Sequence, residues 1–191
     1  MTAILLAPPA LEPITLADAK GWLRLDTTAE DDLVSVLIVS ARMIVEATTR
    51  RMLLTQSWRL VFDGWPQNGI VRIPLAPFQS LTAMRVYDAN NVALPVSSGL
   101  AILDASPDAA RLYFPGNPPM PGRAIAGVEI DVVVGYGAAA ASIPEPIRQA
   151  LRMLVARWYE NRGDVEIDSG AMRLPAAVQA LLAPYCRPRL Q

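Results

Sequence analysis

Few residues in this chain could do chemistry, and two residue types limit the choice most. None of the 191 residues is histidine, which removes the usual general base near pH 7, the nucleophile–histidine pairings and every histidine-ligated metal site. Cys186 is the one cysteine, so neither an intramolecular disulfide nor a two-cysteine metal knuckle can form. The sequence therefore argues against an enzyme, and we predict no cofactor.

Paired carboxylates are the best remaining candidates for acid–base chemistry. Glu129 and Asp131 lie two residues apart in an alternating apolar segment, Gly127–Val134, so they share one face of a predicted strand and could act as general acid and base. An ordinary polar sheet surface explains the same spacing, and we favour it. The face opposite is apolar, because the intervening positions are valine and isoleucine.

Three other motifs have simpler structural interpretations than binding or catalysis. Residues 164–168 resemble the start of a calcium loop, but Ser169 stands where that loop needs glycine and Pro175 replaces its closing glutamate. Gly135-Tyr-Gly137 lacks the lysine of a phosphate loop and the spacing of a dinucleotide site, which favours a tight turn. Arg50-Arg51 ends a predicted helix, where cations offset the helix dipole. No metal ligand set is predicted.

Charge and composition point to a protein that contacts other chains rather than nucleic acid or membrane. Lys+Arg total 17 against 18 Asp+Glu, a net charge of −1, whereas a dedicated nucleic-acid binder carries a basic surface. Charged residues make up 18% and hydrophobic residues 52%, so we expect part of the apolar surface to lie against another chain. The apolar patch near Met1 is too short for a signal peptide, and no membrane span is predicted.

Periodicity divides the chain into three blocks: helical residues 13–54, strand-like residues 55–137 and helical residues 143–186. Capping boxes at Thr15/Asp18 and Thr28/Asp31 predict helices over residues 16–24 and 30–51. We therefore predict an α+β fold in which N- and C-terminal helices form a bundle, with a small antiparallel sheet or sandwich inserted between them. The corresponding domains are a helical core, residues 1–54 plus 138–191, and a β-rich insertion, residues 55–137.

The helix predicted over residues 30–51 is apolar nearly all round, unlike a surface helix with a single apolar face. It is either the central core helix or a helix whose second face meets a neighbouring subunit, and the sequence leaves both open. The candidate subunit-interface residues are Val34, Ile38, Val45, Tyr159 and Arg162.

The order of these motifs resembles the head–tail connector, or adaptor, proteins of long-tailed bacteriophages and gene transfer agents. The resemblance spans nearly the whole chain, and its specificity comes from order and spacing. It rests on Glu12–Lys20, Leu23-Arg24, Glu30–Leu33, Ala41-Arg42, Glu46, Thr49–Arg51, Gln56–Trp58, Asp63–Pro66, Gly135–Gly137, Pro144, Ile147-Arg148, Tyr159–Arg162 and Pro184-Tyr185.

The resemblance implies a non-enzymatic structural protein of the virion neck, made in the bacterial host cytoplasm. Members of this family form a ring, typically of twelve copies, under the portal protein. The ring extends the channel for double-stranded DNA, which passes without specific binding, and offers a docking platform for stopper and tail-side proteins. By position in the family, the portal-binding residues are Leu181, Leu182, Tyr185, Arg187 and Arg189.

Two alternatives stay open at this point. One is a different neck or tail-completion protein, such as a stopper, although such proteins are usually dominated by strands and this chain has predicted helices in both outer blocks. The other is a phage enzyme that uses the carboxylates of Glu129 and Asp131.

Overall fold

The computed structural model describes residues 1–161 and 174–186 of the chain. The fold divides into two compact units, each built from two separate segments. The strand unit contains residues 1–10 and 55–136, and the helical unit contains residues 11–54 and 137–191.

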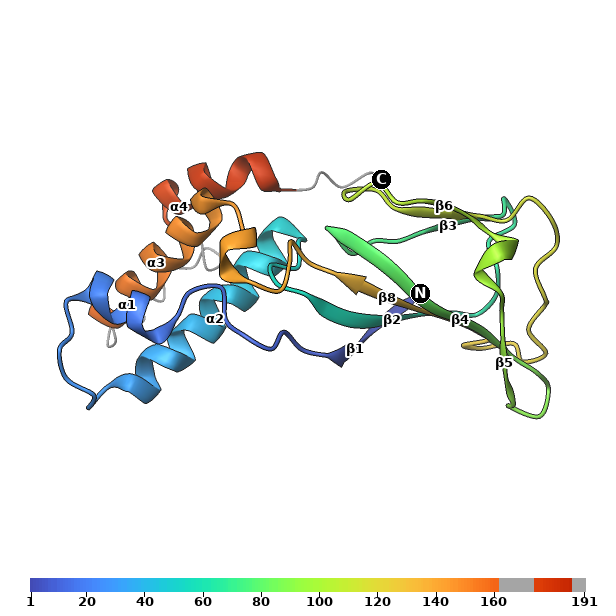
Figure 1. Ribbon diagram of the computed structural model, residues 1–191, viewed down its shortest axis with the longest axis horizontal. Helices are drawn as coiled ribbons and strands as arrows, with labels where there is room; N and C mark the ends of the chain where they lie inside the picture. Colours follow the sequence, from blue (N-terminus) through green and yellow to red (C-terminus); the bar gives the residue numbers. More distant parts are fainter. Residues whose placement is uncertain (162–173, 187–191) are drawn as a thin grey trace, which may run out of the picture. The chain divides into compact units, whose positions relative to one another are not determined.

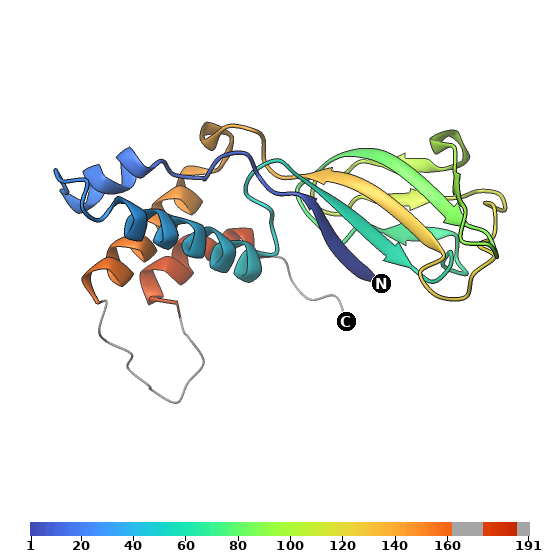
Figure 2. The same ribbon diagram turned by 90° about the horizontal axis from the view of Figure 1, so that it is seen from below.

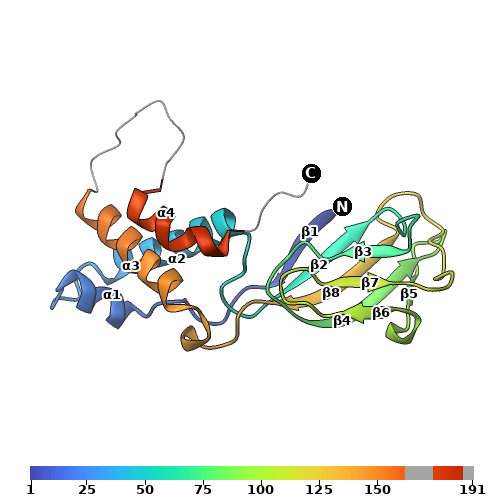
Figure 3. The ribbon, with the colours of Figure 1, turned by 90° about the horizontal axis from the view of Figure 1, so that it is seen from above.

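The strand unit consists of two antiparallel sheets (Figure 1). The larger sheet has the order β1-β2-β8-β4-β5, and the smaller has the order β3-β7-β6. Figure 3 shows the small sheet stacked on the large one, with β3 near β2 and β6 near β4. The strands are β1 (Thr2–Ala7), β2 (Gln56–Phe62), β3 (Ile70–Arg72), β4 (Phe78–Tyr87), β5 (Ala93–Pro95), β6 (Ile102–Asp104), β7 (Arg111–Tyr113) and β8 (Val128–Val134).

The core of the strand unit forms because apolar side chains alternate along the central strands. Ile130 of β8 pairs with Leu60 of β2 on one side and with Met84 of β4 on the other, and all three are buried. Val71 and Leu112 give the small sheet a buried row of its own. The predicted inward positions of β8 are confirmed, since Val128, Ile130, Val132 and Val134 are all fully buried.

The helical unit contains α1 (Leu16–Leu23), α2 (Asp31–Thr49), α3 (Glu145–Glu160) and α4 (Ala176–Leu182). In Figure 2, α2 and α3 lie side by side, with α4 next to α3. The capping box at the start of α1 is confirmed: the Asp18 backbone N–H donates to Thr15 Oγ1 over 3.0 Å, and the Thr15 N–H donates to Asp18 Oδ2 over 3.3 Å.

The capping box predicted at Thr28 and Asp31 is wrong. Glu30 is the N-cap residue of α2, and its side chain makes no capping hydrogen bond. The Asp31 carboxylate instead accepts a hydrogen bond from Lys20 Nζ over 2.6 Å, which ties the end of α1 to the start of α2. The Asp31 carboxylate therefore pairs with Lys20, eleven residues away, and does not make the capping hydrogen bond that the local pattern predicts.

The predicted arrangement of helices and strands is also wrong. The chain is α+β, with four α-helices and two antiparallel sheets among the residues described, but the helices are not an N- and C-terminal bundle that flanks one inserted sheet. The first element is the strand β1, which pairs with β2, and strands dominate the middle of the chain. Thr2–Ala7 shows no polar–apolar alternation, so the period-two signal of a strand is absent there.

Candidate interaction surfaces

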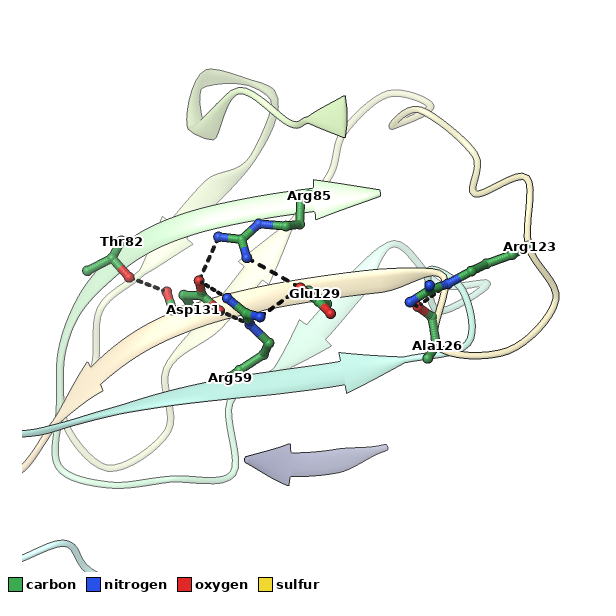
Figure 4. A network of polar contacts seen from close by, with 7 residues as sticks. All are labelled: Arg59, Thr82, Arg85, Arg123, Ala126, Glu129 and Asp131. Atoms are coloured by element: carbon green, nitrogen blue, oxygen red, sulfur yellow. Dashed lines mark hydrogen bonds and ion pairs between the residues drawn. The ribbon is translucent and has the colours of Figure 1, made fainter. Parts of the chain in front are cut away.

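Two carboxylates and two guanidinium groups form a cluster on the face of the large sheet that is opposite the small sheet (Figure 4). This ion quartet consists of Arg59 on β2, Arg85 on β4, and Glu129 and Asp131 on β8. The strand register creates it, because Arg59 pairs directly with Asp131 and Arg85 pairs directly with Glu129. The quartet has no net charge.

The ion quartet is tightly connected. Arg59 binds both oxygens of Asp131, from Nε over 2.7 Å and from Nη2 over 3.0 Å, and Arg85 Nη2 binds Asp131 Oδ2 over 2.7 Å. Both arginines also reach Glu129 Oε2 over 3.3 Å. The carboxylate side chains are only 10–11% exposed and the arginines 25%, so the guanidinium groups cover the acids from solvent.

Its electrostatics hold Asp131 in the ionised form. Burial alone would raise the pKa of Asp131, but the hydrogen bond from Arg59 and the charge of Arg85 outweigh it, so the pKa lies below its usual value. A general acid near neutral pH needs the opposite shift. The geometry therefore gives Asp131 a structural partner role and weakens the hypothesis of a carboxylate enzyme.

The sequence signal for the quartet was incomplete. Glu129 and Asp131 do share the outer face of β8, as the spacing predicts, but they are buried rather than solvent-exposed. Arg59 also occupies the outward register of its own strand, which a sequence can indicate. Which acid it meets depends on strand order and register, and these come only from the folded sheet.

The outer side of α2 carries an exposed apolar stripe. Val36, Val39 and Met43 are 62%, 36% and 60% exposed and recur at positions i, i+3 and i+7, which lie on one helix face. Ser40 lies between them, but its hydroxyl donates to the Val36 carbonyl over 2.9 Å. We call Val36, Val39 and Met43 the α2 stripe. Exposed apolar side chains that lie together are typical of a surface that contacts another protein.

The structure places the predicted subunit-interface residues in other surroundings. Val34, Ile38 and Val45 are buried in the helical unit. Tyr159 is half-buried, and its hydroxyl donates to the Glu30 carboxylate. Arg162 lies outside the described residues. The two apolar sides of α2 are therefore divided, with one in the core of the unit and the α2 stripe open to solvent.

The C-terminal residues predicted to bind a portal lie at the end of α4. Leu182 is buried, whereas Leu181 and Tyr185 are half-buried. Arg187 and Arg189 lie outside the described residues. Sequence reasoning assigned Arg51 only a capping role, but its Nε donates to the Tyr185 carbonyl over 2.8 Å and so fixes the turn that follows α4.

Two hollows open beside α2 on the helical unit, one next to α3 and the other next to α4. One, of about 280 Å³, is lined by Ile44, Leu154 and Trp158 among others. The second, of about 520 Å³, includes Leu182 and the exposed Cys186. Thr48 and Leu174 line both hollows, and the second hollow also includes Ala183 in the turn that Arg51 fixes.

Residues 1–161 and 174–186 contain no group of three or more Cys, Asp or Glu side chains placed to hold a metal ion. The calcium-like sequence at Asp164, Glu166 and Asp168 lies outside these ranges. Among the helices described, none is both long and apolar enough to cross a bilayer.

Comparison with known proteins gives matches at the level of structure. No protein-family model matches the chain, and no curated protein is similar to it in sequence. A chain from the neck of an empty gene transfer agent particle, computed with C6 symmetry, superposes with a TM-score of 0.84 at 28% identity, covering 100% of this chain and 98% of that one. A chain from the virion of a native gene transfer agent particle gives 0.81 at 29% identity, with the same coverage. A chain from a native neck computed with C12 symmetry gives 0.72 at 26% identity, covering 98% of each.

This similarity supports a structural neck component of a phage-like particle. It extends over both units, because the matches cover 98–100% of the chain. A neck component of a symmetric particle must contact other chains.

Proposed function

We propose that this protein is the head–tail adaptor of a phage or gene transfer agent. In this role, copies of the chain form a ring under the portal, extend the DNA channel and provide a docking platform for stopper or tail-side proteins. The observation that supports the proposal most is the full-length structural match to chains from two gene transfer agent necks and from a gene transfer agent virion. One of the matched necks has C12 symmetry, which agrees with a ring of twelve copies.

We propose that the α2 stripe forms part of the contact between neighbouring copies in this ring. A cyclic ring requires each copy to offer two different surfaces, one to each neighbour. Val36 and Met43 are each at least 60% exposed, and a large apolar side chain contributes roughly 1.5–3 kcal/mol when it becomes fully buried. Val34, Ile38 and Val45 would support this contact from beneath, because they fix α2 to the core of its own unit.

We propose that the end of α4 and the segment after it engage the portal, through Leu181, Leu182, Tyr185, Arg187 and Arg189. Leu182 is buried, so its part would be to hold α4 in place, whereas Leu181 and Tyr185 are accessible in part. The hydrogen bond from Arg51 fixes where the chain leaves the helical unit. Arg187 and Arg189, which follow this point in the sequence, could then bind a partner surface.

The charge balance suits a channel that DNA must pass. Affinity for DNA rises with the number of phosphates that lysines and arginines neutralise. With a net charge of −1, the chain as a whole carries no excess of positive charge to hold a duplex.

The test is to mix the purified chain with the portal ring of its own particle and to image the product by electron microscopy. The proposal predicts a second ring stacked coaxially on the portal, in which copies can be counted. A bare portal beside folded, soluble chain would overturn the adaptor role. Binding to an isolated tail-side neck protein in a parallel mixture, with the portal left bare, would instead identify the chain as a stopper or tail-completion protein.

A further inference from the structure

The strand β1 is an unprotected edge of the large sheet. It lies at the end of the strand order, so one side of its backbone has no strand partner among the described residues. All six residues of Thr2–Ala7 are exposed, and Ile4, Leu5 and Leu6 are 47%, 44% and 44% exposed. The segment contains no charge and no proline.

This composition is typical of a strand inside a sheet rather than one at its edge. Apolar side chains on both faces indicate a strand that is covered on both faces. Natural edge strands are usually short, charged, bulged or interrupted by proline, because open backbone groups pair with other strands. The opposite edge of the same sheet follows that rule, since β5 includes Pro95. The register of β1 with β2 shifts between Leu5 and Ala7, so the regular part of the strand, Thr2–Leu5, is the edge suited to pairing.

A second open edge lies on the other flank of the strand unit (Figure 3). In the small sheet, Leu103 of β6 continues the row of Leu112 and Val71. Those two residues are fully buried, whereas Leu103 is 39% exposed and its neighbour Ile102 is 61% exposed. The apolar row is therefore left open at β6, just as the rows of the large sheet are left open at β1.

We propose that β1 of one copy pairs with β6 of the next copy, so that the strand units join edge to edge around the ring. This inference rests on the proposed ring. It identifies a second contact between copies, in addition to the one through the α2 stripe. The occupant is a neighbouring copy because each copy carries two different open apolar edges on opposite flanks. A head-to-tail contact between such edges is the kind that closes into a ring. The C6 and C12 symmetries of the matched necks agree with cyclic assembly.

Pairing of this kind would cover both the open backbone groups and the exposed apolar side chains of β1. Main-chain hydrogen bonds occupy the open N–H and C=O groups of β1, and alternate side chains enter the apolar surface of the neighbour. Ile4 and Leu5 would lie beside Ile102 and Leu103. The absence of charge in β1 removes the repulsion that usually protects an edge.

Cysteine cross-linking on assembled rings tests the pairing directly. All variants carry Cys186→Ser, which removes the native thiol. I4C and I102C are made singly and together, and so are L5C and L103C, so that both strand faces are sampled. Rings are assembled on the portal, treated with a short bismaleimide and separated by denaturing electrophoresis, with a portion imaged by electron microscopy.

The proposal predicts a ladder of covalent oligomers from at least one double variant, ending at the number of copies counted in the ring, and only monomers from each single variant. Dimers from I4C alone would show that β1 pairs with β1, and would overturn it. Intact rings without any ladder would also overturn it while leaving the adaptor role in place. A bare portal with every variant, including the C186S parent, would instead count against the adaptor role.

A second pair of variants separates edge pairing from general surface hydrophobicity. I4K with L6K places two charges on the edge of β1, and we expect at least a tenfold rise in the chain concentration needed for rings. M120K with I125K is the control, because these loop residues are 75% and 77% exposed and lie on no strand. Equal loss of rings in both double variants would contradict the pairing, provided that circular dichroism shows both to be folded.

Discussion

The ion quartet gives the sharpest test of the folding energetics. Replacing Asp131 with asparagine keeps the size of the side chain but removes the charge that three guanidinium hydrogen bonds of 2.7–3.0 Å address. Hydrogen bonds to charged groups contribute about 1.5–3 kcal/mol each, and breaking a buried ion pair costs about 3–5 kcal/mol. Since the arginines are 25% exposed and can regain water, we expect a loss of about 2–3 kcal/mol in the free energy of unfolding.

Equilibrium urea unfolding of the full chain, followed by circular dichroism and by tryptophan fluorescence, measures this loss. Two of the four tryptophans, Trp58 and Trp65, belong to the strand unit that carries the quartet, so the fluorescence signal includes that unit. Asp104→Asn is the matched control, because its ion pair with Arg111 joins the same residue types across paired strands but is 46–48% exposed. That control should cause no measurable change.

The stability difference between wild type and D131N should also depend on pH. The pKa of Asp131 is lower in the folded chain than its ordinary value of 3.8, so its contribution is complete above that value and is lost as pH falls through the folded pKa. The difference in stability between wild type and D131N should therefore be constant from about pH 5 to 7 and should shrink in more acidic solution. A loss below about 0.5 kcal/mol at pH 7, or an equal loss in D104N, would show that the quartet does not stabilise the sheet.

Three further predictions concern the helical unit. Val36→Asp with Met43→Asp places charge on the α2 stripe and should abolish ring assembly without changing the helical circular dichroism. The control, Ile125→Asp, should leave rings intact. Rings that persist in the double variant would show that the α2 stripe is not part of the interface. Arg51→Ala deletes the hydrogen bond to the carbonyl after α4 and should lower stability by about 1 kcal/mol and weaken portal binding in a pull-down assay, and unchanged binding would contradict its positioning role. Thr15→Ala removes the N-cap of α1 and should cost about 1 kcal/mol in urea unfolding, while Thr15→Ser should restore most of it.

The sequence predicted best where one local pattern decides the structure. The alternation in β8 correctly assigned its buried valines and isoleucine, and the spacing of Thr15 and Asp18 correctly located the start of α1. Both signals are contained within a few residues. The prediction of a capping box at Thr28 was wrong, and the Asp31 carboxylate instead accepts a hydrogen bond from Lys20, eleven residues away.

The features that the sequence missed depend on contacts between distant segments. β1 was missed because its uniform apolar run lacks a strand period, and its position at the edge of the sheet follows only from its pairing with β2. The quartet needed the register of three strands, and its members Arg59 and Asp131 are 72 residues apart in the chain. The burial pattern of α2 was open in the sequence because both of its sides are apolar, and only the positions of α1 and α3 show which side is the core.

A cryo-electron microscopy map of the neck of the particle that carries this chain would decide the adaptor role. That role predicts a ring of this protein immediately under the portal, with the segment after α4 in contact with portal density. Density for this chain at a level of the neck that does not touch the portal, or no density for it in the neck, would contradict the adaptor role.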